Sequence, residues 1–290
     1  MDDYALIDAG DGRRLEQLGH LVVDRPAPGA AGPRRDPGRW RDADLRFEPG
    51  RGWGGRVDAG RPWPVHVADL TLELRATASG GLGLYPEHAG NLAWLEAAIG
   101  SGLQASASSP REARRPSVLN LFAHTGLATL AAARAGAAVA HVDAARSSVA
   151  WARRNAALSG LADRPIRWLV DDATAFVERE ARRGRRYDGF IIDPPSAGHG
   201  RAGRWTLRGD LASLVGACAA VAADDAFVLL TAHSTGLTGE ELAAPLLQAF
   251  GRRPGEAEIR RLTLAAASGA ALDLGWAVRL GGSSRRNTAP

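Results

Sequence analysis

Lysine is absent from this chain, so arginine carries all of its positive charge apart from histidine. The sequence has 36 basic residues against 32 acidic ones, which gives a net charge of +4 over 290 residues. Alanine and glycine are also abundant. This pattern indicates a compositional bias, so the arginine content alone is no evidence for phosphate binding. The mild positive charge permits a nucleic-acid partner without requiring one.

Cysteine is nearly absent as well. The single residue, Cys218, excludes an internal disulfide and fits a reducing compartment. No apolar run approaches the ~20 residues needed to span a bilayer, and the acidic N-terminus does not look like a signal sequence. We therefore expect a cytoplasmic protein with no membrane partner, whose 45% hydrophobic residues are sufficient for a large core.

Residues 1–84 are rich in glycine, proline and tryptophan and predict a small β-rich N-terminal module. Residues 65–74 alternate apolar and polar side chains as a strand does, and residues 25–39 read as a loop. The module shows no zinc-ligand spacing. Its tryptophans are expected to pack in a core or hinge rather than to stack on bases; they are Trp40, Trp53 and Trp63.

Residues 85–290 have a different sequence pattern, in which short apolar runs alternate with stretches of helical periodicity. A helix is expected over 86–99 and a linker over 100–116. The expected strands are 117–122, 138–143, 166–170, 187–193 and 226–233, and the expected helices are 126–135, 147–159, 173–183, 207–222 and 238–250. Such a series implies parallel strands with right-handed crossovers. Residues 258–280 predict two more strands, which form a hairpin at the edge of the sheet.

Ligands of an open α/β sheet bind beyond the carboxyl ends of the strands, so the residues after each strand matter most. The first strand is followed by a loop with one glycine at the helix entry; the loop is Asn120, Leu121, Phe122, Ala123, His124, Thr125 and Gly126. A dinucleotide needs several glycines beneath its pyrophosphate. S-adenosylmethionine carries no phosphate, so a bulkier loop suits it.

Acidic residues follow the second and third strands. Asp143 can accept hydrogen bonds from both hydroxyls of a ribose, although it can equally cap the next helix. Asp171 and Asp172 follow the third strand, and we assign Asp172 to the adenine amine and Asp171 to capping or solvent.

The fourth strand ends in the most specific feature of the sequence, Asp193-Pro194-Pro195-Ser196. Two prolines impose an extended, rigid exit from a buried strand and remove two backbone donors. The glycine-rich residues 198–205 that follow are expected to form a flexible lid, in which His199 is a solvated residue.

These segments together resemble a known family. VLNLFAHTG, HVDAARSSVAWARRNAALSGL and DDATAFVEREARRGRRYDGFIIDPPSAGHG are similar to class I S-adenosylmethionine (SAM) methyltransferases, which include bacterial large-subunit ribosomal RNA methyltransferases. The N-terminal ALIDAGDGRRLEQLGHLVVDRP and GLYPEHAGNLAWL resemble a branch with a small β module in place of an RNA-binding PUA domain. The resemblance implies a Rossmann-like α/β fold with a mostly parallel seven-stranded sheet.

The resemblance also implies a site. SAM would contact the 120–126 loop, Asp143, Asp172 and Asp193, with Tyr85 and Glu87 near the pocket. As a separate hypothesis, we expect Asp193, Pro194 and Pro195 to align the methyl acceptor. RNA, and ribosomal RNA in particular, is the substrate that the family favours.

The chain departs from its family in two places. Leu127 stands where many relatives have a second glycine. Members that methylate carbon 5 of cytosine place a nucleophilic cysteine near the end of the fifth strand, where this chain has His233 and Ser234. Cys218 lies in a predicted helix among alanines and is expected to be buried.

The prediction is therefore direct methyl transfer without a covalent cysteine intermediate and without a metal site. A methyltransferase of protein or small molecules stays open, as does a non-catalytic protein that binds SAM or RNA. A nicotinamide-dependent oxidoreductase is disfavoured by the missing glycine pattern. An oligomer is possible.

Overall fold

The computed structural model describes residues 3–106, 114–200, 203–233 and 236–282. The chain forms two units, and each is described by itself. The first comprises residues 1–92, 151–162 and 262–274, and the second comprises residues 93–150, 163–261 and 275–290. No helix among the described residues is long and apolar enough to cross a lipid bilayer.

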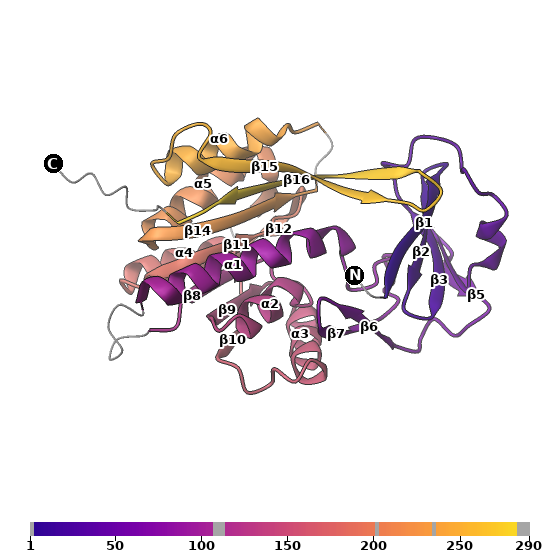
Figure 1. Ribbon diagram of the computed structural model, residues 1–290, viewed down its shortest axis with the longest axis horizontal. Helices are drawn as coiled ribbons and strands as arrows, with labels where there is room; N and C mark the ends of the chain where they lie inside the picture. The colour runs from indigo at the N-terminus through magenta and orange to yellow at the C-terminus, as the bar shows by residue number, and fades with distance from the viewer. Residues whose placement is uncertain (1–2, 107–113, 201–202, 234–235, 283–290) are drawn as a thin grey trace. The chain divides into compact units, whose positions relative to one another are not determined.

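A seven-stranded sheet forms the centre of the second unit, although residues 262–274 of its last two strands and their turn are assigned to the first unit (Figure 1). Its strands are β8 (Ser117–Leu121), β9 (Ala138–Asp143), β10 (Ile166–Val170), β11 (Tyr187–Ile192), β14 (Ala222–Ala232), β15 (Ala257–Ala265) and β16 (Ala271–Leu280). Their order is β10-β9-β8-β11-β14-β16-β15, and the first five run parallel. β16 runs antiparallel to β14. The predicted α/β class is confirmed, as is the hairpin at the sheet edge.

Helices cover both faces of this sheet because each carries an apolar stripe (Figure 1). α4 (Ala173–Arg182), α5 (Leu207–Ala220) and α6 (Gly239–Ala249) share one apolar core with alternate residues of the strands. α1 (Ala89–Ser106) and α2 (Leu127–Arg134) pack on the opposite face, where Trp94 of α1 meets Phe227 of β14 with ring centroids 6.1 Å apart. α3 (Arg146–Leu158) follows β9.

Strand order places the ligand-binding edge. β8 pairs with β9 on one side and with β11 on the other, so the chain reverses its direction of winding between β8 and β11. In open α/β sheets the crevice beyond the carboxyl ends at this point is where ligands bind. The exits of β8, β9 and β11 are therefore the place for a site.

A five-stranded sheet forms most of the first unit. Its strands, in spatial order, are β1 (Tyr4–Gly10), β2 (Arg13–Leu18), β3 (Leu21–Pro26), β4 (Leu45–Glu48) and β5 (Gly52–Gly55). Trp40 and Trp63 are buried as predicted, and their indole N–H groups donate to Asp8 and to the Leu18 carbonyl. Trp53 is half-buried and donates to the Thr77 carbonyl.

Two predictions about elements were wrong. Residues 65–74 were expected to form one strand, but they belong to a hairpin of β6 (Trp63–Val67) and β7 (Leu70–Leu74). Ala68 and Asp69 turn the chain with φ of 48° and 61°, without the Asn-Gly pair that marks such turns in a sequence. Residues 100–106 were expected to belong to a linker, but they continue α1 to Ser106 despite Gly100. Residues 107–113 lie outside the described residues.

Candidate active site

The loop after β8 has an unusual backbone. Phe122 and His124 adopt left-handed φ angles of 56° and 48°, and Gly126 follows with 93°. The Ala123 N–H donates to the Val142 carbonyl of β9, which fixes the middle of the loop. Left-handed non-glycine residues cost free energy and cluster at ligand sites. The loop is thus held in a tight shape directly at the expected crevice.

Asp143, at the end of β9, supports this loop from the neighbouring strand. Its Oδ2 accepts from the His124 N–H at 2.8 Å, and its Oδ1 accepts from the Ala145 N–H at 2.8 Å. Each carboxylate oxygen can accept a second hydrogen bond. Asp143 can therefore hold the loop and receive ribose hydroxyls at the same time.

A buried polar chain lies beneath the loop. The Asn120 side-chain amide donates to Thr129 Oγ1 at 2.8 Å, and Thr129 Oγ1 is 2.9 Å from His141 Nδ1. All three residues are at most 2% exposed. This row of hydrogen-bonded side chains ties α2 to β8 and β9. Sequence reasoning missed Thr129 and His141.

The acids after β10 divide their roles differently from the prediction. Asp172 caps α4, and its Oδ1 accepts from the Ala175 N–H at 2.9 Å. Asp171 pairs with Arg179. Asp171 was assigned to capping or solvent, and the capping alternative is wrong because α4 begins at Ala173 and the cap is the residue directly before it, Asp172. A contact of Asp172 with the cofactor stays a prediction.

Asp193, at the exit of β11, is held by the parallel neighbour β14. The Thr231 hydroxyl donates to Asp193 Oδ1 at 2.6 Å, and His233 Nε2 lies 3.7 Å from the same oxygen. Pro194 is buried and Pro195 is exposed. The exits of β11 and β14 therefore bring one carboxylate and one imidazole together at the carboxyl edge of the sheet. Ser234 lies outside the described residues.

The segment expected to be a flexible lid forms a short hairpin of β12 (Ala197–Gly200) and β13 (Gly203–Thr206). Trp205 anchors it, because its indole N–H donates to the Pro195 carbonyl at 2.9 Å. Its ring also packs against Phe122 of the loop, with centroids 5.8 Å apart. Sequence reasoning missed Trp205, whose only signal was an aromatic residue among glycines and arginines. The side chain of His199 lies outside the described part.

Tyr85 and Glu87 belong to the first unit, where a short 3-10 helix (Pro86–His88) precedes α1. Glu87 is buried, whereas Tyr85 is 45% exposed and meets His88 edge to face. Their predicted place near the cofactor stays a prediction.

Cys218 is buried in α5, as predicted. Burial raises the pKa of its thiol to about 12. A buried thiol that resists ionisation is a poor nucleophile.

Comparison with solved structures decides the family. No family model matches this chain. The crystal structure of a SAM-dependent methyltransferase from Agrobacterium tumefaciens is 33% identical to it, with a TM-score of 0.86 over 98% of this chain and 91% of that one. The chain belongs to the SAM-dependent methyltransferases. A putative SAM-dependent methyltransferase from Streptococcus mutans, 16% identical, shares the fold with a TM-score of 0.73 over 96% of this chain and 74% of that one.

Shorter similarity links this methyltransferase to curated proteins. Over 85 residues it is 41% identical to the ribosomal RNA large subunit methyltransferase K/L of Methylococcus capsulatus. The matched segment is 29% of this chain and only 12% of the length of that protein. The predicted family, fold and cofactor are confirmed. The residues of this methyltransferase fit SAM. The Asp143 carboxylate can accept from the hydroxyls of a ribose, and the loop after β8 lacks the several glycines that a phosphate-binding loop needs.

Proposed function

We propose that this methyltransferase transfers a methyl group from SAM directly to a nucleophilic atom of an RNA base. Ribosomal RNA is the favoured substrate, and the cytoplasm is the proposed location. The observation that carries the mechanism is the grouping of Asp193, Thr231 and His233 at the exits of two adjacent strands, where His233 occupies the region in which a covalent mechanism would need a cysteine.

The cofactor-binding residues have distinct proposed roles. Asp143 accepts from the ribose hydroxyls while it holds the loop through His124. Asp172 has one oxygen on the cap of α4, and its carboxylate accepts from the adenine amine. The left-handed loop at Phe122 and His124 lets the backbone pass close beneath the cofactor. Asn120 acts through the buried chain that fixes this loop.

Bound SAM would supply the methyl group on a sulfonium. The side chains at the exit of β11 then orient the acceptor and take its proton. Asp193 accepts a hydrogen bond from the acceptor N–H or O–H, Thr231 fixes the rotamer of that carboxylate, and His233 shares the released proton. Pro194 and Pro195 keep the turn rigid. No covalent bond to the protein is required, in agreement with the protonated Cys218.

RNA as the substrate is supported by the 41% identity to part of a ribosomal RNA methyltransferase. Exposed RNA bases are reached by splaying them out of the strand into a pocket. A methyltransferase of protein or a small molecule, and a non-catalytic protein, are the alternatives that an experiment must separate.

Calorimetric titration with SAM tests the site first. Wild type, Asp143→Ala and the control Asp224→Ala, which removes an exposed acid of the same unit, are compared, with NADH as a second ligand. We expect SAM binding by wild type and the control, and loss of binding in Asp143→Ala. Absence of binding by folded, ligand-free wild type would contradict the proposal.

Incubation with radiolabelled SAM then tests the substrate. Transfer of label to ribosomal RNA supports the proposal, and mass spectrometry of the digested RNA names the base. Transfer to protein or small molecules alone contradicts the RNA substrate. Binding of SAM without transfer to any acceptor favours the non-catalytic alternative.

A further inference from the structure

A pocket lies at the edge of the seven-stranded sheet opposite the candidate active site. Its lining includes Ser117, Ala138, Ile166 and Tyr187, which are the first residues of β8, β9, β10 and β11. Because these strands are parallel, all four mark the amino edge, whereas the candidate active site lies at the carboxyl edge. The cavity has a volume of about 740 Å³ and belongs wholly to the second unit.

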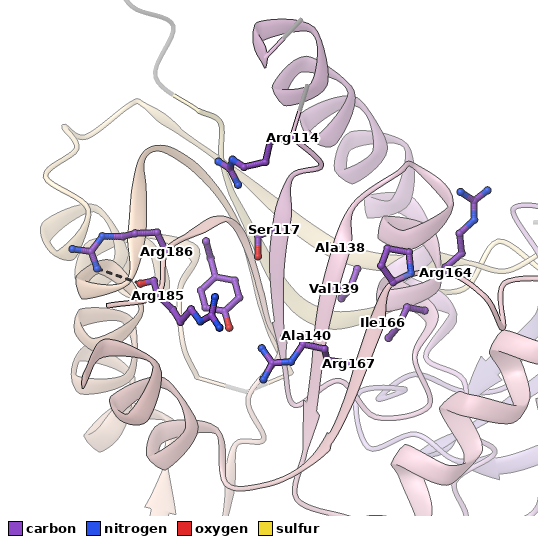
Figure 2. Close-up of a pocket in the computed structure, with 12 residues that line it drawn as sticks. Arg114, Ser117, Ala138, Val139, Ala140, Arg164, Ile166, Arg167, Arg185 and Arg186 are labelled. Atoms are coloured by element: carbon purple, nitrogen blue, oxygen red, sulfur yellow. Dashed lines mark hydrogen bonds between the residues drawn. The ribbon is translucent and has the colours of Figure 1, made fainter. Parts of the chain in front are cut away.

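The pocket is strongly basic. Figure 2 shows five arginine side chains around it; they are Arg114, Arg164, Arg167, Arg185 and Arg186. No aspartate or glutamate is among the 12 lining residues, although the chain as a whole carries 32 acids against 36 basic residues. Compositional bias explains why these cations are arginine. It does not explain why three separate segments bring five of them to one cavity without a carboxylate in its lining.

Two of these arginines are engaged in the structure of the rim. Arg114 forms a two-pronged ion pair with Asp188 at 2.7 and 2.6 Å, and this contact raises the pKa of its guanidinium. Asp188 also accepts from the Ser117 N–H at 2.7 Å. Arg186 donates to the Ala220 carbonyl at 2.9 Å. These contacts hold the rim in place.

The guanidinium groups of the other three arginines are available to bind an anion. Arg167 is exposed, and it lies 3.8 Å from Glu180, a carboxylate that already pairs with Arg183 and accepts from Tyr187. Arg164 and Arg185 are exposed, and their guanidinium groups have no hydrogen-bonding or ion-pair partner among the residues that the structure describes. Like charges gathered in this way repel one another and attract an anion.

The lining also indicates what kind of anion fits. Guanidinium groups bind phosphate oxygens in a two-pronged geometry, and their positions on several sides of an open cavity suit several phosphates better than one. The single aromatic residue of the lining, Tyr187, is 4% exposed and donates its hydroxyl to Glu180. A nucleobase therefore finds no aromatic platform here, which favours contact with a backbone over reading of bases.

We propose that this pocket binds the phosphate backbone of the RNA substrate, at nucleotides other than the one that is methylated. The identity of the polyanion as RNA rests on the proposed function. The pocket would add affinity without sequence specificity, and the residues at the carboxyl edge would select the base.

Two triple variants test the pocket with equal changes in charge. Arg164→Gln/Arg167→Gln/Arg185→Gln removes the available arginines, and Arg39→Gln/Arg61→Gln/Arg253→Gln removes three exposed arginines elsewhere. Each lowers the net charge from +4 by three, to +1. Binding of a fluorescein-labelled single-stranded RNA is measured by anisotropy over a range of salt concentrations, with SAM binding by calorimetry as the check on folding.

We expect the pocket variant to bind RNA about ten-fold more weakly, with a salt slope smaller by about 2, because each phosphate contact on a single strand contributes ~0.7. The control variant should change by less than about two-fold, and both should bind SAM as wild type does. Equal loss in both variants, no loss in the pocket variant, or no RNA binding by wild type overturns the proposal.

The two proposals fail in different ways. If wild type methylates RNA and the pocket variant binds and methylates it equally well, the pocket proposal fails and the proposed function stands. If RNA binding depends on the pocket but no RNA is methylated, the pocket stands and the proposed function fails.

Discussion

The Thr231 hydroxyl donates a 2.6 Å hydrogen bond to Oδ1 of Asp193 and so joins the exits of β14 and β11. Thr231 is 2% exposed, so the donor side of this bond is buried. The contact fixes one oxygen of a carboxylate whose position the Asp-Pro-Pro turn has already restricted. Thr231 is therefore a positioning residue for Asp193 in the proposed reaction.

Thr231→Val keeps the shape of the side chain and removes the hydroxyl. We expect methyl transfer to RNA to fall about ten-fold in kcat, since misplaced catalytic groups lose rate steeply, with little change in the affinity for SAM. Thr231→Ser restores the donor and should recover most of the rate. Equal loss of kcat in the serine and valine variants would show that the hydroxyl does not position Asp193.

Thr129→Val should destabilise the protein and loosen the cofactor loop together. The substitution leaves the Asn120 amide and His141 Nδ1 without this buried partner. Each buried polar group that loses its hydrogen bond costs ~1–3 kcal/mol, so we expect the free energy of unfolding in urea to fall by about 2 kcal/mol or more. Affinity for SAM should fall too. Thr129→Ser, which keeps the hydroxyl, is the control and should lose less on both measures.

The parallel sheet and the acids at its carboxyl edge were predictable from the sequence. Two apolar runs are followed directly by Asp143 and Asp193, and these acids mark where the strands end. Which of Asp171 and Asp172 caps α4 was not predictable, because a shift of one residue in the start of the helix changes the answer. Thr129 and His141 were hidden for another reason. A polar residue in an apolar run has no partner in the sequence until the topology brings β8, β9 and α2 together.

The arginine pocket shows the same limit on a larger scale. Its arginines come from the segments at 114, 164–167 and 185–186, and each alone reads as a charged loop on the surface. Only the parallel register of the four strands gathers their amino ends at one cavity. The hairpin at Ala68 and Asp69 was missed because its turn lacks glycine.

Gly189→Ala should destabilise the sheet. A Cβ at this position of β11 would lie 2.1 Å from the Phe227 ring on the neighbouring strand, so the ring or the strand must move. Overpacking of this kind costs ~1–3 kcal/mol, measured as a decrease in the free energy of unfolding. Gly216→Ala is the matched control, because a Cβ there in α5 meets open space and should raise stability by about 1 kcal/mol. Equal effects of the two substitutions would contradict the close packing at Gly189.

Cys218 gives a prediction about both mechanism and pH. Burial raises the pKa of its thiol from 9.0 to about 12, so the folded protein keeps it protonated where the unfolded chain begins to ionise. Ionisation of the thiol in the unfolded chain alone therefore lowers the free energy of unfolding as the pH rises through 9 toward 12.

At pH 8 iodoacetamide should not label Cys218 in the native protein but should label it fully in denaturant. Cys218→Ala should retain methyl transfer to RNA, since the proposed reaction uses no thiolate. Loss of transfer in a folded Cys218→Ala variant, with SAM binding intact, would instead assign the cysteine a part in the chemistry.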